Sequence, residues 1–208
     1  MTDPLSVLQR LRETQPRAQP RAGERCELCT EPISDEHGHL VDVHERKLLC
    51  SCRGCYLLFM SEGAGGGHFR AVPDRYLSFP DFRLSPAQWD SLQIPVSVAF
   101  FLVNSALDRV AAFYPGPAGA TESLLPLDTW ADVVAANPAL ATLQPDVEAF
   151  LVRADRNVGG AECFVVPIDV CYELVGRLRT LWRGFDGGRE AHDALDAFFE
   201  RVRTKARR

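Results

Sequence analysis

The stretch that decides the fold spans residues 24–60 and reads ERCELCTEPISDEHGHLVDVHERKLLCSCRGCYLLFM. A Cys-x-x-Cys pair lies near each end of it, Cys26/Cys29 and Cys52/Cys55, with 22 residues between the two pairs. Each pair predicts a tight turn that presents two thiolates, and the chain between them can fold back to bring the turns together. Four thiolates in a tetrahedral arrangement suit zinc, which can also stabilise a segment that buries little apolar surface. The sequence therefore predicts one zinc ion bound by these four cysteines, with iron as the alternative metal.

The chain between the two pairs predicts a β-hairpin. Residues 39–49 contain two short apolar arms around the polar residues 44–47, a pattern typical of two antiparallel strands. After the second pair, residues 56–60 read YLLFM and predict the opening of a buried helix or an extension of the cysteine turn. Together these features predict a small zinc-ribbon-like module.

A fifth thiol complicates the predicted ligand set. Cys50 lies two residues before Cys52, and we expect only one of the two side chains to face the metal. We interpret Cys50 as a small buried side chain that is not required for metal retention. The alternatives are that Cys50 is a ligand in place of Cys52, or that it belongs to an iron–sulfur or labile metal site.

Histidines in the hairpin add nitrogen atoms that could bind a metal. In the segment His37-Gly38-His39 we expect the two imidazoles to face opposite ways, which disfavours a second metal site. We expect His39 to order the hairpin or to donate a hydrogen bond to a thiolate. The alternative role of His39 is that of a metal ligand.

The chain divides into three predicted segments. Residues 1–23 form a flexible N-terminal segment, residues 24–67 form the zinc-ribbon-like module and a glycine-rich joint, and residues 68–208 form an α+β domain. Short connections between the strand candidates favour antiparallel pairing. The predicted fold class is thus α+β, with the module followed by a mainly antiparallel sheet packed with helices. Strands are predicted at 68–72, 96–103, 109–114, 147–153 and 162–166, and helices at 86–93, 128–136, 169–183 and 189–203.

Composition and charge argue against two classes of protein. The net charge of the 208 residues is −5. Residues 26–60 are also acidic, which argues against nucleic-acid binding. Their charged side chains are Glu27, Glu31, Asp35, Glu36, Asp42 and Glu45 against Arg46, Lys47 and Arg53. The longest apolar run, residues 94–103, is too short to span a membrane. We therefore expect a cytoplasmic protein with no membrane span and no nucleic-acid partner.

The predicted α+β domain yields no catalytic residue. Cys171 follows the start of a predicted helix, where the helix dipole lowers the pKa of a thiol, but it also fits the inward face of that helix. The one histidine towards the C-terminus, His192, belongs to a polar stretch. We interpret Cys171 as a packed thiol, and we expect a protein that is not an enzyme.

Four strings carry a resemblance to a known family: CELCTEPISDEHGHLVD (26–42), LLCSCRGCYLLF (48–59), FYPGPAGATES (113–123) and VVPIDVCYELVGRLRTLWRG (165–184). They resemble a mainly actinobacterial family of uncharacterised proteins whose genes often lie beside NiFe-hydrogenase structural and maturation genes. The positions that match the family's pattern are Cys26, Cys29, Cys50, Cys52, Cys55 and His39. The resemblance implies a role in hydrogenase assembly or function, with hydrogenase subunits or maturation factors as partners.

Two functions from different classes follow from these observations. The first is a zinc-binding accessory protein that binds a protein partner. The alternative is a rubredoxin-like iron protein that transfers electrons or metal, because rubredoxins also use two Cys-x-x-Cys pairs. The second pair reads Cys-Arg-Gly-Cys-Tyr and lacks the Pro and Gly pattern typical of rubredoxins, so we favour the first function.

Overall fold

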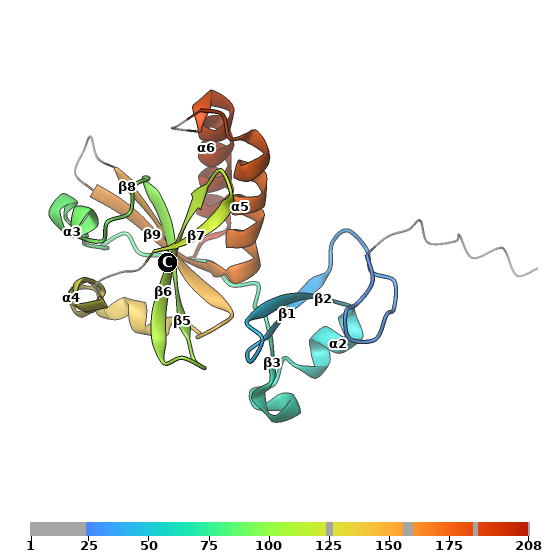
Figure 1. Ribbon diagram of the computed structural model, residues 1–208. Helices are drawn as coiled ribbons and strands as arrows, with labels where there is room; N and C mark the ends of the chain where they lie inside the picture. Colours follow the sequence, from blue (N-terminus) through green and yellow to red (C-terminus); the bar gives the residue numbers. More distant parts are fainter. Residues whose placement is uncertain (1–23, 124–126, 156–159, 185–186, 208) are drawn as a thin grey trace, which may run out of the picture.

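A computed structural model describes residues 24–123, 127–155, 160–184 and 187–207 (Figure 1). The predicted flexible segment, residues 1–23, lies outside the described residues. The described chain forms two antiparallel sheets and a set of helices, which confirms the α+β class. No helix among the described residues is long and apolar enough to cross a membrane.

The small sheet has three strands in the order β2-β1-β3. Its first two strands form the predicted hairpin, and Asp42 Oδ1 accepts the N–H groups of His44 and Glu45 in the turn between them. The helix predicted after the second cysteine pair is present as α2, but none of its residues is buried, so the prediction of a buried helix is wrong. The elements are β1 (Gly38–Asp42), β2 (Lys47–Ser51), α2 (Arg53–Leu58), the 3-10 helix η1 (Ala64–Gly67) and β3 (Phe69–Ala71).

The third strand of the small sheet comes from the segment after the glycines. β3 pairs antiparallel with β1, with Ala71 opposite Leu40. The glycine-rich stretch, residues 63–67, therefore connects two elements that both belong to the small sheet and its helix. The chain that leads from the small sheet to the rest of the protein is residues 72–76.

The large sheet has six strands in the order β4-β9-β8-β5-β6-β7, and all neighbours are antiparallel. The four strands at its centre match the predicted ones, whereas β4 and β7 at its two edges were not predicted. The sequence did not predict β7 because it follows a proline- and glycine-rich stretch around Pro115 and Pro117, which is typical of a loop. The strands are β4 (Leu77–Ser78), β5 (Val98–Asn104), β6 (Arg109–Gly116), β7 (Gly119–Ser123), β8 (Glu148–Asp155) and β9 (Gly160–Pro167).

Helices cover both faces of the large sheet (Figure 1). Side chains that alternate along β5 separate the two cores: Phe100 packs on the α5 and α6 side, and Phe101 packs against Trp130 of α4. The four predicted helices are all present. They are α3 (Pro86–Ser91), α4 (Leu127–Ala136), which continues into the 3-10 helix η2 (Pro138–Thr142), α5 (Ile168–Leu181) and α6 (Gly188–Lys205).

The small sheet packs directly against the rest of the protein. Val41 of β1 and Val72 belong to the same buried apolar cluster as α5 and α6. Arg70 of β3 forms an ion pair with the buried Asp146, with 3.2 Å between Arg70 Nη1 and Asp146 Oδ2. These contacts hold the start of α5 beside the hairpin.

A buried ion pair fixes the chain that joins the two sheets. Arg75 Nε donates to Glu148 Oε1 at 2.7 Å, and Arg75 Nη2 donates to the carbonyl oxygen of Thr142 at 2.8 Å. Glu148 at the start of β8 is completely buried, and the N–H of Gln144 also donates to its carboxylate. The connecting chain is thus tied to the large sheet by charge-assisted hydrogen bonds.

Candidate metal centre

The first cysteine pair lies in a turn that backbone hydrogen bonds close. The Cys26 N–H donates to Glu31 O at 2.9 Å, and the Thr30 N–H donates to Cys26 O at 2.8 Å. Thr30 adopts a positive φ of 63°, which turns the chain back after Cys29. The Glu27 N–H donates to the carbonyl oxygen of Cys50 on β2, so this turn is attached to the hairpin.

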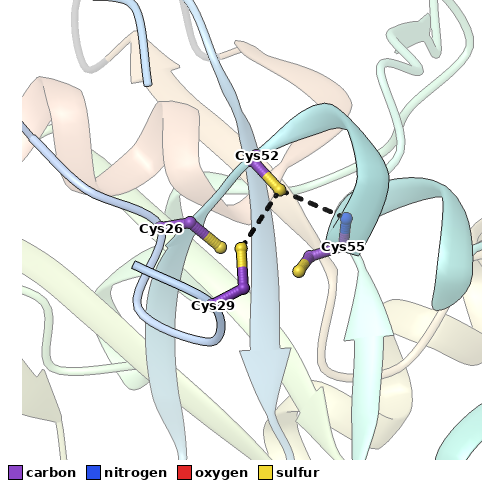
Figure 2. A group of neighbouring side chains, drawn as sticks. All are labelled: Cys26, Cys29, Cys52 and Cys55. Atoms are coloured by element: carbon purple, nitrogen blue, oxygen red, sulfur yellow. Dashed lines mark hydrogen bonds between the residues drawn. The ribbon is translucent and has the colours of Figure 1, made fainter. Parts of the chain in front are cut away.

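The second pair lies where a strand becomes a helix. β2 ends at Ser51, and Cys52 is the N-cap residue of α2. Its sulfur accepts the N–H of Cys55 at 3.4 Å, in the way that a capping side chain satisfies the first turn of a helix. Cys52 and Cys55 therefore present their sulfurs on the same side of this helix start (Figure 2).

The fold brings the four predicted cysteines together. The sulfurs of Cys26, Cys29, Cys52 and Cys55 all lie within 4.8 Å of one another and point toward a common centre (Figure 2). Two thiolates on one tetrahedral zinc ion, each about 2.3 Å from it, lie about 3.8 Å apart. The distance between Cys29 Sγ and Cys52 Sγ is 3.6 Å, which is close to that edge length. The four residues could bind a metal ion, and the chemistry of the donor set fits one that prefers sulfur.

The electrostatics of the cluster favour a cation. Burial raises the pKa of the Cys26 thiol, but the N–H groups of Cys52, Cys29 and Leu28 donate to its sulfur and lower the pKa to about 6. Burial and the neighbouring sulfurs raise the pKa of Cys55. The pKa of Cys29 is also raised, because the sulfurs of Cys26 and Cys52 outweigh an N–H from Glu31. One thiolate thus disfavours further ionisation at its neighbours, and a bound cation would reverse that preference.

Cys50 does not lie among these four sulfurs. Its side chain groups instead with His37 and His39, with one ligand atom from each residue within 4.8 Å of the others. Cys50 and Cys52 separate because β2 ends at Ser51, whose hydroxyl donates to the carbonyl oxygen of Gly38. Cys50 is partly exposed, so it is not the fully buried side chain that we expected.

The expectation that His37 and His39 face opposite ways is wrong. Residues two apart in an extended chain share a face, and the two ring centroids are 4.8 Å apart. The predicted hydrogen bond from His39 to a thiolate is replaced by a longer-range contact. His39 Nδ1 lies 2.8 Å from Oδ2 of Asp169, which is 130 residues away in the chain. The His-x-His spacing is enough to indicate the contact between His37 and His39. No feature of the sequence indicates the contact between His39 and Asp169.

The two remaining cysteines are buried thiols in the core. Cys163 on β9 and Cys171 on α5 both have raised pKa values because they are buried, and the charge of Asp169 raises that of Cys171 further. A buried thiol with a raised pKa is a poor nucleophile. This agrees with the interpretation of Cys171 as a packed thiol.

Fold and site together define an α+β protein with a candidate four-cysteine metal site beside its small sheet. A family model matches residues 25–206, and the chain belongs to this family, whose description is "Family of unknown function (DUF5947)". Comparisons with curated proteins and with solved structures gave no match.

Proposed function

We propose that the protein is a zinc-binding accessory factor whose metal holds a protein-binding surface in place. The observation that carries the proposal is the approach of four cysteine sulfurs to within 4.8 Å of one another. A closed set of four thiolates is typical of structural zinc, which leaves no open position for catalysis. The ion would connect the two turns into a zinc-ribbon-like module around the hairpin.

Exposed apolar side chains that lie close in sequence to the two cysteine pairs support partner binding. Leu28 lies inside the first cysteine pair, and Leu57, Leu58 and Met60 follow the second pair. Their exposed fractions are 36%, 47%, 66% and 58%, respectively. Leu57, Leu58 and Met60, which lie within four residues of one another along the chain, are called the apolar patch here, and exposed apolar groups of this kind are typical of protein-binding surfaces. The metal would keep these side chains in fixed positions, so that binding a partner costs little conformational entropy.

Metal analysis distinguishes zinc from iron directly. The full chain, purified in reducing buffer and desalted in the presence of a weak chelator, should retain about one equivalent of zinc and show no visible absorption. This result is expected because four thiolates bind zinc tightly and zinc has no coloured thiolate transitions. Less than about half an equivalent of zinc, with iron and a visible spectrum in its place, would favour the rubredoxin-like alternative.

The apolar patch should determine partner capture. Leu57→Ser together with Leu58→Ser should reduce the recovery of a bound partner at least about tenfold, because each removes an exposed apolar side chain that a partner could cover. The double variant should keep the zinc content of the wild type. Leu107→Ser is a matched control, since Leu107 is also exposed (46%) but lies in the turn between β5 and β6. Equal recovery by the double variant and the control would contradict the role of the patch.

For the partner itself we propose a hydrogenase subunit or maturation factor. This part of the proposal rests on the sequence resemblance alone. Affinity purification followed by mass spectrometry should identify such a protein with the wild-type chain and with Leu107→Ser. A deletion strain with normal hydrogenase level, activity and complex size would contradict the assignment.

A further inference from the structure

The register of the hairpin creates a second group of metal-binding side chains. His39 on β1 is directly opposite Cys50 on β2, so their side chains leave the sheet on the same face. His37, two residues before His39, lies on that face as well. Gly38 between the histidines packs against the Tyr56 ring so closely that a Cβ would lie 2.5 Å from a ring carbon. The two imidazoles and the thiol are therefore held together by the backbone.

His37 has a buried nitrogen that makes no hydrogen bond to the described residues. Its Nδ1 lies 2.8 Å from the carbonyl oxygen of Ser34, which leaves Nε2 as the free ring nitrogen. Nε2 is buried and has no hydrogen-bond partner among the described residues, and only 9% of the side chain is exposed. The nearest carboxylate oxygen, Oε2 of Glu24, is 3.6 Å away. A buried nitrogen without a hydrogen bond destabilises the fold, so a ligand at this position would restore stability.

The ring of His39 is also held through its Nδ1, but by a carboxylate instead of a backbone carbonyl. Its Nδ1 contacts Oδ2 of Asp169 at the start of α5. Metal-binding histidines usually donate one ring N–H to a carboxylate or a backbone carbonyl, which fixes the ring and makes the other nitrogen more basic. His39 has the carboxylate form of this arrangement and His37 has the carbonyl form. In both, Nε2 is the nitrogen left to bind an ion.

We propose that His37, His39 and Cys50 bind a second divalent ion of the late first-row transition metals, separate from the ion of the four-cysteine cluster. Two imidazoles and one thiolate are a borderline donor set, which suits zinc and cobalt better than magnesium or calcium. Three protein ligands leave one coordination position for the nearby Glu24 carboxylate or for a small external ligand. The second ion is therefore exchangeable, whereas the ion of the four-cysteine cluster is not.

The surroundings of this second site provide access and negative charge. His37 and His39 line a cavity of about 580 Å³ between the small sheet and the start of α5. Asp169 lines the same cavity and contributes a carboxylate next to His39, whereas the third proposed ligand, Cys50, is partly exposed outside its lining. Glu27 adds a second carboxylate close by, because its Oε2 accepts the Cys50 N–H at 2.8 Å.

Cobalt binding tests the second site on the full chain. Zinc-loaded wild-type protein, titrated with Co²⁺ in reducing buffer, should take up one further equivalent and show visible d–d bands with a sulfur-to-cobalt charge-transfer band. Cys50→Ser should lose the charge-transfer band while it retains the zinc of the four-cysteine cluster. His37→Gln should weaken Co²⁺ binding more than about tenfold, and Asp169→Asn should weaken it by about 10–100-fold. His192→Gln is the matched control, since this exposed histidine on α6 should leave Co²⁺ binding unchanged.

The outcomes separate this inference from the proposed function. The second site would be overturned, with the four-cysteine site left intact, if the zinc-loaded wild-type chain took up no Co²⁺. It would also be overturned if His37→Gln and Cys50→Ser each bound Co²⁺ with the affinity and spectrum of the wild type. A Co²⁺ spectrum that depends on His37 in a chain that holds no zinc would support the second site and contradict the proposed function. Circular dichroism of each variant shows whether the fold is retained.

Discussion

Cys52→Ser should abolish retention of the structural metal and loosen the small sheet, while the large sheet stays folded. A serine hydroxyl is a poor zinc ligand, and structural zinc sites of this kind supply about 10–16 kcal/mol of apparent binding free energy. Serine is also a good N-cap residue, so α2 keeps its cap and the metal effect is isolated. Metal analysis and hydrogen exchange of the amides in residues 38–51 measure the two consequences.

Cys50→Ser is the matched control for this variant. It makes the same chemical change two residues away, in a side chain that lies outside the four-sulfur cluster. It should retain the zinc and the protection of the hairpin amides. A Cys52→Ser chain with a full equivalent of zinc and wild-type exchange rates would show that Cys52 is not a ligand.

Arg75→Met should lower the free energy of unfolding by about 3 kcal/mol, because it leaves the Glu148 carboxylate buried without its cationic partner. Glu148 is completely buried, and Arg75 supplies two of the hydrogen bonds that its carboxylate accepts. The Arg75 side chain is one-third exposed, so water can replace part of the interaction and the loss falls at the low end of the usual range. Urea unfolding followed by circular dichroism measures the change.

An exposed ion pair provides the comparison for Arg75→Met. Arg109 and Glu122 pair across β6 and β7 with 43% and 40% of their side chains exposed. Arg109→Met should therefore cost less than about 1 kcal/mol. Replacing Glu148 by Gln in the Arg75→Met chain should recover part of the stability, since the buried charge is removed. If Arg75→Met and Arg109→Met were equally stable, the buried pair would not contribute as described.

The fold was predictable where sequence patterns are local. Apolar spacing gives α5 and α6, and alternation gives the central strands of the large sheet, because both patterns reflect one buried face of one element. The four-cysteine cluster was equally predictable from the sequence, since each Cys-x-x-Cys pair forms its own local turn. The strand β7 was not, because its sequence GATES has no apolar alternation and it follows a stretch rich in proline and glycine, which is typical of a loop.

The second candidate site depends on information that single elements do not carry. His37 and His39 share a face because side chains two residues apart in an extended chain point the same way. The position of Cys50 opposite His39 needs the hairpin register. The contact with Asp169 needs the packing of α5 against the small sheet, which joins residues 130 positions apart.

That long separation sets an order of events during protein synthesis. All four sulfurs of the first cluster come from residues 26–55, and the third strand of the small sheet ends at Ala71. A chain that emerges from the ribosome N-terminus first can therefore acquire its structural metal before the large sheet exists. The residue that orients His39 emerges only with α5, more than 100 residues after the last of these cysteines. The nascent protein would thus be able to bind the first ion early and would become competent for the second only after α5 has emerged.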